Sequence, residues 1–535
     1  MSKSTKTSFA RQRSTTIASI PASVNARRST VTAIAGTDPR TGTTTNVIDE
    51  TTTAEVTRIA WAAADAAPQF EQAGRGFRAA LLRAIADEFA ARRHLIVETA
   101  DRETALGPTR LNGELTRTVY QARLFADVLD EGSYLEAAID HAADTPMGPG
   151  PDLRRLLVPI GPVAVFGASN FPLAFSVPGG DTVSALAAGN PVVVKAHSSH
   201  PATSLAAFEA MVAAALRLGT PDGVLSIVFG QAAGGALVAD PHIKAVGFTG
   251  SLGGGQALLD IIGRRDEPIP FYGELSSLNP VVVTPGAAAA RGPAIGTGLA
   301  DSFTVSAGQL CTKPGLVFVP AGDAGDALAA AAAEAVGDTD APVLLNERIF
   351  TSFGEISGRA EGLGAVSVLA RGGKPAEEGF AVTPLLLSIT AADLTPQATG
   401  ECFGPMTIIA RYNSDDELRA AIDELPSSLT GTIHAEDDEV DRVSELTGIL
   451  RAKAGRVLYN GYPTGVLVSW AQTHGGPWPA TNTLHTSVGT TAIRRFLRPV
   501  TWQNAPEFAL PEELRESYAA IPRRVDGRLI VPNRS

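Results

Sequence analysis

The chain has little cysteine, no long apolar segment and no excess of basic charge. Only two of its residues are cysteine and nothing in their placement suggests a disulfide framework, so a reducing cytoplasm is the expected compartment. No apolar run approaches the roughly 20 residues that a membrane span needs, so no membrane partner is expected. The formal net charge of −12 argues against a nucleic-acid partner, because a phosphate backbone repels an acidic surface.

Length and the first residues indicate the domain organisation. A chain of 535 residues exceeds one hydrophobic core, which predicts two or three domains. Residues 1–30 are polar and basic, with no acidic residue before Asp38, and they lack the apolar core of a secretory signal. We therefore expect a disordered leader or an over-long start, with a transit peptide as the alternative.

The hydrophobic pattern changes along the chain. Apolar residues at three- and four-residue spacing predict helices over Thr53–Ala67, Gly76–Arg93 and Asn112–Leu129. From Leu157 onward, short apolar runs alternate with helical segments, which is typical of right-handed βαβ crossovers and parallel sheets. The expected fold class is α/β, with two doubly wound parallel-sheet domains that meet near Gly273–Glu274. The strands expected are Val163–Phe166, Val192–Lys195, Val224–Phe229, Ala245–Phe248, Val281–Val283, Val317–Val319, Leu385–Leu387, Ile408–Tyr412, Gly431–His434 and Val457–Asn460.

Polar residues at the carboxyl ends of the strands are candidate ligand contacts, because open parallel sheets bind ligands there. Asn170 follows the first strand and Lys195 ends the second. A Gly250-Ser251 turn opens a helix that carries Gly255, and free N–H groups at a helix start suit a phosphate. A structural turn is the alternative, because no Gly-x-Gly-x-x-Gly follows the first strand.

Cys311 is the candidate nucleophile. It lies in the segment Ser306-Ala-Gly308-Gln-Leu-Cys311, between a predicted helix (292–307) and a predicted strand (314–319). A thiol at a turn between two buried elements is held rigidly and can face a cleft. Only the thiolate is reactive, so a nearby base or positive dipole is required. The alternative is a small buried hydrophobe, and this is how we interpret Cys402.

Six segments, in their order and spacing, resemble the aldehyde dehydrogenase superfamily, over about residues 40 to 510. They are Ser-Asn170-Phe-Pro, Lys195, Phe-Thr-Gly250-Ser251, Gly-Glu274-Leu-Ser-Ser-Leu-Asn-Pro, Gly308-Gln-x-Cys311 and Glu401-Cys-Phe-Gly404-Pro405. Asn460–Val466, His474–Thr481 and Thr486–Gly489 further resemble the branch with NADP-dependent 2,5-dioxopentanoate dehydrogenases and bacterial long-chain aldehyde dehydrogenases. One departure is Ser169, where most of the superfamily carries Trp; it alters the wall near the substrate.

The resemblance implies a role for each residue. The Cys311 thiolate attacks the aldehyde carbon, and the Asn170 amide with the backbone N–H of Cys311 holds the oxyanion. The thiohemiacetal passes hydride to a nicotinamide and leaves a thioester. Glu274 is a general base for Cys311 or for the water that hydrolyses the thioester. Glu401 holds the nicotinamide ribose and Phe403 flanks the ring. For both glutamates the alternative is a carboxylate without a chemical role.

The resemblance also bears on the cofactor. In the superfamily, an NAD-preferring enzyme often carries glutamate three residues after the strand-end lysine, where it bonds the ribose 2′-hydroxyl. Here that position is Ser198, which follows His197. A carboxylate repels a 2′-phosphate, whereas a hydroxyl or an imidazole can donate to it. We therefore expect NADP, with NAD as the alternative.

The expected substrate is a semialdehyde that carries a carboxylate, most specifically 2,5-dioxopentanoate, which is oxidised to 2-oxoglutarate. Such a substrate needs a fixed cation, because burying its charge unpaired is costly. Arg117 and Gln121 share one helix face with Arg110, on the helix that aligns with the substrate entrance of the family. Phe171 and Phe175 supply an apolar wall. The alternative for Arg110 and Arg117 is that they pair with Glu114 on a solvated face. The alternative substrate is a long-chain aldehyde.

The remaining expectations concern metals and assembly. His474 lies in a Gly/Pro loop without a metal partner at ligand spacing, so we interpret it as structural and expect no metal site. A thiol hydrolase would need a His base near Cys311, and sequence distance leaves that open. A non-catalytic family member is disfavoured because Asn170, Glu274 and Cys311 are all present.

The resemblance implies a homodimer or homotetramer held by a β arm, because exposed strand edges favour pairing. The domains expected are a cofactor-binding domain (31–142 and 157–273), a catalytic domain (274–481), an oligomerisation arm (143–156 and 482–500) and a C-terminal tail (501–535).

Overall fold

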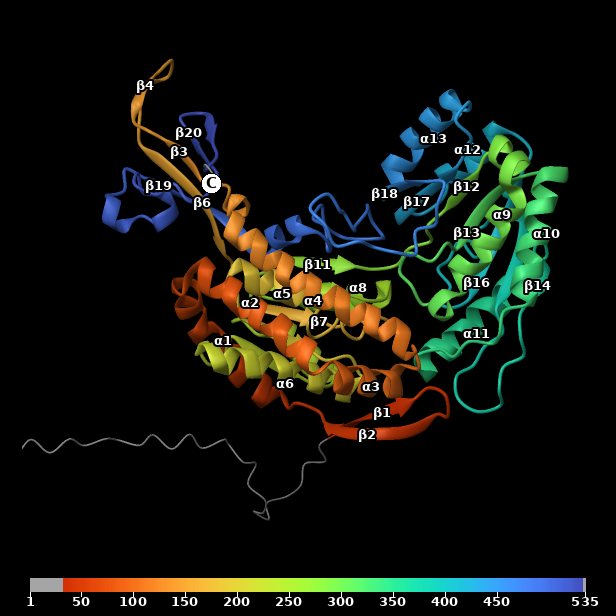
Figure 1. Cartoon of the computed structure of the whole chain (residues 1–535), viewed down its shortest axis with the longest axis horizontal. Helices are drawn as coiled ribbons and strands as arrows, with labels where there is room; N and C mark the ends of the chain where they lie inside the picture. The colour runs from red at the N-terminus through yellow and green to blue at the C-terminus, as the bar shows by residue number, and fades with distance from the viewer. Residues whose placement is uncertain (1–31, 533–535) are drawn as a thin grey trace, which may run out of the picture.

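Two parallel sheets organise the chain in the computed structural model, which describes residues 32–532 (Figure 1). The predicted leader lies outside the described residues. The first sheet has five parallel strands in the order β11-β10-β7-β8-β9. These are β7 (Val163–Phe166), β8 (Val192–Lys195), β9 (Leu225–Val228), β10 (Ala245–Thr249) and β11 (Phe271–Glu274). The central strands are runs of valine, alanine and phenylalanine buried on both faces, as helix-covered parallel strands require.

Helices cover both faces of this sheet. Thr52 caps the first of them through a capping box with Glu55, and Ser251 caps the helix that follows β10. Phe70, Leu82 and Phe125 are fully buried in the core between the helices and the sheet. The helices are α1 (Thr53–Gln72), α2 (Gly74–Ala91), α3 (Arg93–Thr104), α4 (Pro108–Glu131), α5 (Gly180–Ala188), α6 (Pro201–Leu218), α7 (Gln231–Ala239) and α8 (Leu252–Ile262).

The second sheet has seven strands in the order β14-β15-β16-β13-β12-β17-β18, of which only β14 runs antiparallel. The strands are β12 (Val281–Val283), β13 (Leu316–Pro320), β14 (Ser367–Arg371), β15 (Leu385–Thr390), β16 (Met406–Tyr412), β17 (Ser428–His434) and β18 (Ala454–Tyr459). Its helices are α9 (Pro285–Thr304), α10 (Asp323–Gly337), α11 (Glu347–Glu361), α12 (Asp415–Asp423) and α13 (Val440–Lys453).

The prediction of an α/β fold with two parallel sheets is confirmed. All ten expected strands are present, with bounds that differ by at most three residues at either end. The elements that were missed lack a clear pattern. β11 contains a glycine and ends at the predicted domain junction, β14 is an exposed edge strand, and α3 is largely polar.

A third sheet, here called the arm sheet, has the strand order β19-β6-β3-β20-β21. It contains β3 (Ala138–Asp140), β6 (Leu153–Pro159), β19 (Leu497–Gln503), β20 (Arg523–Val525) and β21 (Arg528–Ile530). The predicted boundaries of the arm and the tail need correction. Residues 490–496 form a 3-10 helix rather than a strand, and the predicted tail supplies the end of β19 and two further strands.

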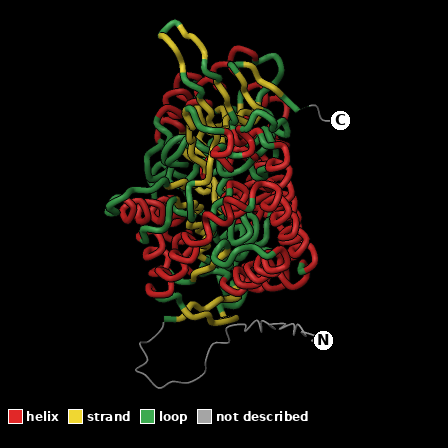
Figure 2. Tube along the Cα trace, turned by 90° about the vertical axis from the view of Figure 1, so that its left-hand side faces the viewer, coloured by secondary structure: helices red, strands yellow, loops and turns green. Residues whose placement is uncertain are grey.

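Two small hairpins lie at opposite ends of the molecule. The hairpin of β4 (Ala143–Thr145) and β5 (Gly148–Gly150) projects beyond the arm sheet at the top of Figure 2. The hairpin of β1 (Ala33–Asp38) and β2 (Thr43–Asp49) lies at the other end, beside α3 and α6. Helix α6 is long and apolar enough to cross a membrane by length and composition, but it packs against α2 and α3.

Candidate active site

The turn that carries Cys311 is held from several sides. Gly308 has φ +65°, and a Cβ there would lie 2.3 Å from the Gly404 carbonyl oxygen, so this close approach requires glycine. The Gln309 side-chain oxygen accepts from the Leu345 N–H at 2.9 Å. The Asn279 amide donates to the Cys311 carbonyl at 2.8 Å. The thiol is therefore presented from a backbone that is fixed before any ligand binds.

Glu274 and His474 meet at the Cys311 sulfur. The His474 Nε2 atom lies 3.5 Å from the Cys311 Sγ and 2.9 Å from the Glu274 Oε1. Ser487 donates to the other Glu274 oxygen at 2.8 Å. His474 is fully buried and Glu274 is nearly so. The structure therefore joins residues from β11, the turn before β13 and a loop near the carboxyl end of the chain.

The interpretation of His474 as a structural loop residue needs correction, since it contacts both the candidate nucleophile and the candidate base. The sequence hid this contact, because 163 residues separate His474 from Cys311 and 200 separate it from Glu274. Ligand spacing along the sequence showed no partner for His474, but in the folded chain one ligand atom from each of Glu274, Cys311 and His474 lies within 4.8 Å of the others.

The charges of this group are set by burial and by its mutual contacts. Burial raises the pKa of Glu274, but His474, Ser487 and Cys311 outweigh it and hold the pKa below its usual value. Glu274 is therefore ionised and only accepts, which places a proton on the His474 Nε2. Burial and the Glu274 charge raise the pKa of Cys311 well above its ordinary value. Cys311 accordingly holds its proton at neutral pH before ligands bind.

A cavity of about 290 Å³, here called the thiol cavity, opens on the Cys311 sulfur. It is lined by the residues predicted from the catalytic motifs, which are Asn170, Glu274, Cys311, Glu401 and Phe403. The Asn170 amide donates to the Gln309 carbonyl at 2.9 Å, which fixes it beside the turn of the nucleophile. Arg110 donates to the Asn170 carbonyl at 2.6 Å and holds the backbone from the other side.

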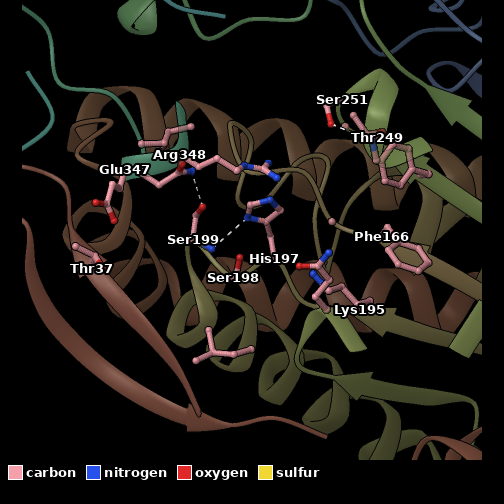
Figure 3. A pocket seen from close by; sticks show the side chains of 18 of the residues that line it. Thr37, Phe166, Lys195, His197, Ser198, Ser199, Thr249, Ser251, Glu347 and Arg348 are labelled. Carbon is pink, nitrogen blue, oxygen red and sulfur yellow. Dashed lines mark hydrogen bonds between the residues drawn. The ribbon is translucent and has the colours of Figure 1, made fainter. Parts of the chain in front are cut away.

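A larger cavity of about 740 Å³, the cofactor cleft, lies at the carboxyl ends of the first sheet's strands (Figure 3). Lys195, His197, Ser198 and Ser251 line it as the sequence predicts. His197, Ser251 and the unpredicted Arg348 line both cavities. The cofactor cleft therefore continues into the thiol cavity, as a dinucleotide that reaches a nucleophile requires.

His197 is oriented by the turn that follows β8. The Ser199 N–H donates to the His197 Nδ1 at 3.1 Å, which leaves the Nε2–H free to donate (Figure 3). Burial, together with the cations around it, lowers the pKa of His197 well below its ordinary value. The ring is thus a neutral donor. Burial and the nearby Arg348 also lower the pKa of Lys195, to about 8, so that lysine is cationic for most of the chain population at pH 7.

The glycine turn at the start of α8 forms one wall of the cofactor cleft. Gly250 and Ser251 line both cavities, and Ser251 caps α8 by accepting from the Gly254 N–H at 3.2 Å. Gly254 lines the cleft, whereas a Cβ on Gly255 would meet the Leu275 side chain at 2.4 Å. Gly255 is therefore closely packed and lines neither cavity.

Glu401 and Phe403 line the thiol cavity on the side of the second sheet. The Glu401 carboxylate accepts from the Ser276 hydroxyl at 2.6 Å. Burial raises the pKa of Glu401, with the Ser276 hydrogen bond opposing it. Cys402 lies between these residues in the sequence and is 3% exposed within the apolar core. Burial raises the pKa of its thiol to about 11, which agrees with its interpretation as a packing residue.

Helix α4 presents two arginines toward the site, and their surroundings differ. Arg110 lies over the Phe171 ring, 4.7 Å from its centroid, and 3.9 Å from the Glu114 carboxylate. Glu114 itself is buried and accepts from two backbone N–H groups at 2.8 Å each. The alternative of a solvated charge pair is therefore wrong, because the pair lies inside the protein.

Arg117 is stacked but not paired. Its guanidinium lies over the Phe175 ring, 4.9 Å from the centroid, and its Nε donates weakly to the Val466 carbonyl at 3.4 Å. Within residues 32–532, the two terminal nitrogens of Arg117 are buried without a hydrogen-bond partner, as is the Nε2 of Gln121. Burial lowers the pKa of Arg117, while Glu114, Cys311 and Glu274 oppose that shift. A buried guanidinium near the nucleophile thus has free donors.

Sequence reasoning missed two residues of the site. His474 was detectable as a histidine in a segment that resembles one branch of the family, but nothing in the sequence places it at Cys311. Arg348 lies at the start of α11, outside any motif, and only the folded chain brings it to the cofactor cleft.

Comparison with known proteins identifies the family to which the chain is similar. The model of the aldehyde dehydrogenase family matches residues 26–482. An alpha-ketoglutaric semialdehyde dehydrogenase 2 from Azospirillum brasilense is 46% identical over 483 residues, which cover 89% of this chain and 92% of that protein. An alpha-ketoglutaric semialdehyde dehydrogenase from Acinetobacter baylyi is 40% identical over 489 residues, 90% of this chain and 93% of that protein.

Solved structures share the fold at lower identity. A mutant aldehyde dehydrogenase C from Pseudomonas syringae, in complex with NAD+ and octanal, has a TM-score of 0.76 and 21% identity over 89% of this chain and 94% of its own. A 3,6-anhydro-L-galactose dehydrogenase in complex with NAP has a TM-score of 0.76 and 22% identity over 89% of this chain and 97% of its own.

Proposed function

Because the chain belongs to the aldehyde dehydrogenase family, we propose that it oxidises 2,5-dioxopentanoate to 2-oxoglutarate with NADP. The names of the two relatives that are 46% and 40% identical support this substrate. The observation that carries the proposal is Arg117, whose buried terminal nitrogens have no hydrogen-bond partner within the described chain. A guanidinium in that state suits a carboxylate, which takes two parallel N–H bonds from it.

The reaction begins at Cys311. Its sulfur bonds to the aldehyde carbon as the thiol proton leaves to solvent, and the His474 Nε2 atom lies 3.5 Å from the sulfur. The His474 Nε2–H donates to Glu274 and lies within reach of the sulfur, so it also stabilises the developing thiolate. The oxyanion that forms is held by the Asn170 amide and the Cys311 backbone N–H. When bound, the nicotinamide supplies the hydride acceptor.

Hydrolysis of the resulting thioester needs a base that is ionised at neutral pH. Glu274 meets this condition, because its contacts hold its pKa below the usual value. Ser487 fixes one carboxylate oxygen and His474 the other, so the carboxylate is oriented toward the thiol cavity. Water attacks the thioester carbon, Glu274 takes its proton, and the carboxylate product leaves with Cys311 free again.

NADP rather than NAD is proposed from the donors at the turn after β8. The cleft fits a dinucleotide, because it runs from Ser198 past the start of α8 to the thiol cavity. The His197 Nε2–H and the Ser198 hydroxyl would donate to a 2′-phosphate, and Lys195 with Arg348 would attract it. No carboxylate stands at the position of Ser198, where it would favour the 2′-hydroxyl of NAD.

The test is Arg117→Ala assayed with 2,5-dioxopentanoate and with pentanal, a neutral aldehyde of the same length. Loss of a charge-assisted contact of about 1.5–3 kcal/mol should lower kcat/KM for 2,5-dioxopentanoate about 10- to 150-fold, through KM. Pentanal should change little. Arg117→Lys keeps the charge but loses the two parallel N–H donors of the guanidinium. Its kcat/KM for 2,5-dioxopentanoate should therefore lie between the values of the unsubstituted protein and of Arg117→Ala. Equal losses with both aldehydes would contradict the assignment.

A further inference from the structure

The Glu274–Cys311–His474 cluster has the composition of a metal site as well as that of a catalytic group. Sulfur, imidazole nitrogen and carboxylate oxygen are the three donor types that Zn²⁺ takes in proteins. Each of the three residues directs one such atom to a common point, and all three atoms lie within 4.8 Å of one another. Within the described chain, the cluster is assembled from segments 37 to 200 residues apart, so its geometry is a product of the fold.

The separation of the sulfur and nitrogen donors matches tetrahedral coordination. With a Zn–S bond of about 2.3 Å and a Zn–N bond of about 2.0 Å, a tetrahedral angle separates sulfur and nitrogen by about 3.5 Å. The Cys311 Sγ and the His474 Nε2 lie 3.5 Å apart. The nitrogen and the Glu274 Oε1 lie 2.9 Å apart, somewhat less than the roughly 3.3 Å that the same angle gives for Zn–N and Zn–O bonds of about 2.0 Å.

The surroundings favour a bound cation and leave one position open. Ser487 donates to the second oxygen of Glu274 at 2.8 Å and would orient the carboxylate as an outer-shell partner. The His474 Nδ1 is buried and has no partner within residues 32–532, so it is free to take the ring proton. The cluster opens into the thiol cavity of about 290 Å³, which leaves room for a water as fourth ligand.

We propose that Cys311, His474 and Glu274 form an inhibitory site for a thiophilic divalent cation of the Zn²⁺ class. On binding, the Cys311 S–H bond breaks, an S–Zn bond forms, and the thiol proton goes to solvent. The proton on the His474 Nε2 shifts to Nδ1, and Nε2 donates its lone pair to the metal. Nothing is oxidised or reduced, so a chelator reverses the binding. The bound metal occupies both the nucleophile Cys311 and the general base Glu274, so aldehyde oxidation stops. This inhibitory role rests on the proposed function.

The experiment measures Zn²⁺ binding to the full-length protein without cofactor or substrate. Isothermal titration should give one site per chain, and mass spectrometry should show that Zn²⁺ protects Cys311 from iodoacetamide. His474→Ala should raise the Kd at least about tenfold, since even outer-shell changes cost that much. Glu274→Gln and His474→Gln are second variants that retain volume in case the alanine variant misfolds. Mg²⁺ should neither bind nor protect, because it does not take thiolate.

Two control variants separate this site from others. Cys402→Ala removes the second thiol, which is packed in the core, and should leave Zn²⁺ binding unchanged. His141→Gln removes an exposed histidine that contacts Asp526 at 2.8 Å and Glu516 at 3.0 Å. The proposal is overturned if His141→Gln abolishes binding, or if Zn²⁺ binds without protecting Cys311. Aldehyde oxidation in the presence of a chelator tests the proposed function separately, so either can fail alone.

Discussion

At the residue scale, the reactivity of Cys311 depends on two neighbours that lie far from it in the sequence. Glu274 and His474 share one hydrogen bond, and each also faces the sulfur. The sequence motifs predicted Glu274 as the base, and the structure adds a histidine that orients it. Burial and ionised Glu274 raise the pKa of the Cys311 thiol, so the carboxylate beside the nucleophile helps to keep it protonated at rest.

This arrangement predicts the pH dependence of thiol alkylation. The pKa of Cys311 lies well above its ordinary value of 9.0 because of burial and of Glu274. In cofactor-free protein, the iodoacetamide rate at Cys311 should therefore still be rising above pH 9, where an ordinary thiol levels off. Cys402 should react more slowly at every pH, because it is 3% exposed. A plateau below pH 8, or prior labelling of Cys402 in the mass spectrum, would count against the account.

Substitution of Glu274 tests the order of the chemical steps. Glu274→Gln should keep a pre-steady-state burst of NADPH, because thiol attack and hydride transfer precede the step that needs the base. Steady-state turnover should fall by about 10²- to 10⁴-fold, the usual contribution of a general base. Stopped-flow absorbance measures both phases. Loss of the burst itself would place Glu274 in thiol activation instead.

At the element scale, the turn from β8 to α6 and the start of α8 form the cofactor cleft. Short valine-rich strands carry a strong local pattern, so β8 was predictable from the sequence with correct bounds, and the Gly250-Ser251 turn marked the start of α8. The strands of the arm sheet were not, because β3, β20 and β21 have three residues each and acquire their structure only by pairing with one another and, for β3, with β6.

The turn after β8 gives the prediction on cofactor choice. Ser198→Glu places a carboxylate beside the proposed 2′-phosphate position, and repulsion should lower kcat/KM with NADP by roughly tenfold or more. Activity with NAD should be kept or improved. Ser198→Gln is the matched control, since it adds similar volume without charge. Equal kcat/KM with NADP and NAD in the unsubstituted protein would contradict the proposed preference.

At the scale of the whole molecule, two parallel sheets hold the cofactor cleft and the thiol cavity between them. The sequence predicted both sheets, the catalytic residues that line the thiol cavity and some of the residues that line the cofactor cleft. It could not predict contacts between distant loops, such as that of His474 with Cys311, or that Gly255 packs on Leu275 rather than facing the cleft. Such contacts depend on how loops from the two sheets pack against each other, and the hydrophobic periodicity of the sequence does not determine that packing.

Assembly is the prediction that belongs to this scale. The edge strands of the arm sheet, β19 and β21, have unpaired backbone groups on their outer sides within residues 32–532, and Met147 at the tip of the β4–β5 hairpin is 95% exposed. We expect a symmetric dimer or a pair of dimers. Light scattering at micromolar concentration should give at least twice the chain mass of 55.4 kDa. A mass of one chain would contradict this expectation.

The most direct test of the central claim compares two aldehydes of equal length in the unsubstituted protein. The account predicts that kcat/KM with NADP is at least about tenfold higher for 2,5-dioxopentanoate than for pentanal, because Arg117 contributes only when the substrate carries a carboxylate. Cys311→Ala should abolish the oxidation of both while cofactor binding stays nearly intact. Pentanal or longer aliphatic aldehydes outperforming the semialdehyde would contradict the account and favour a fatty aldehyde as substrate.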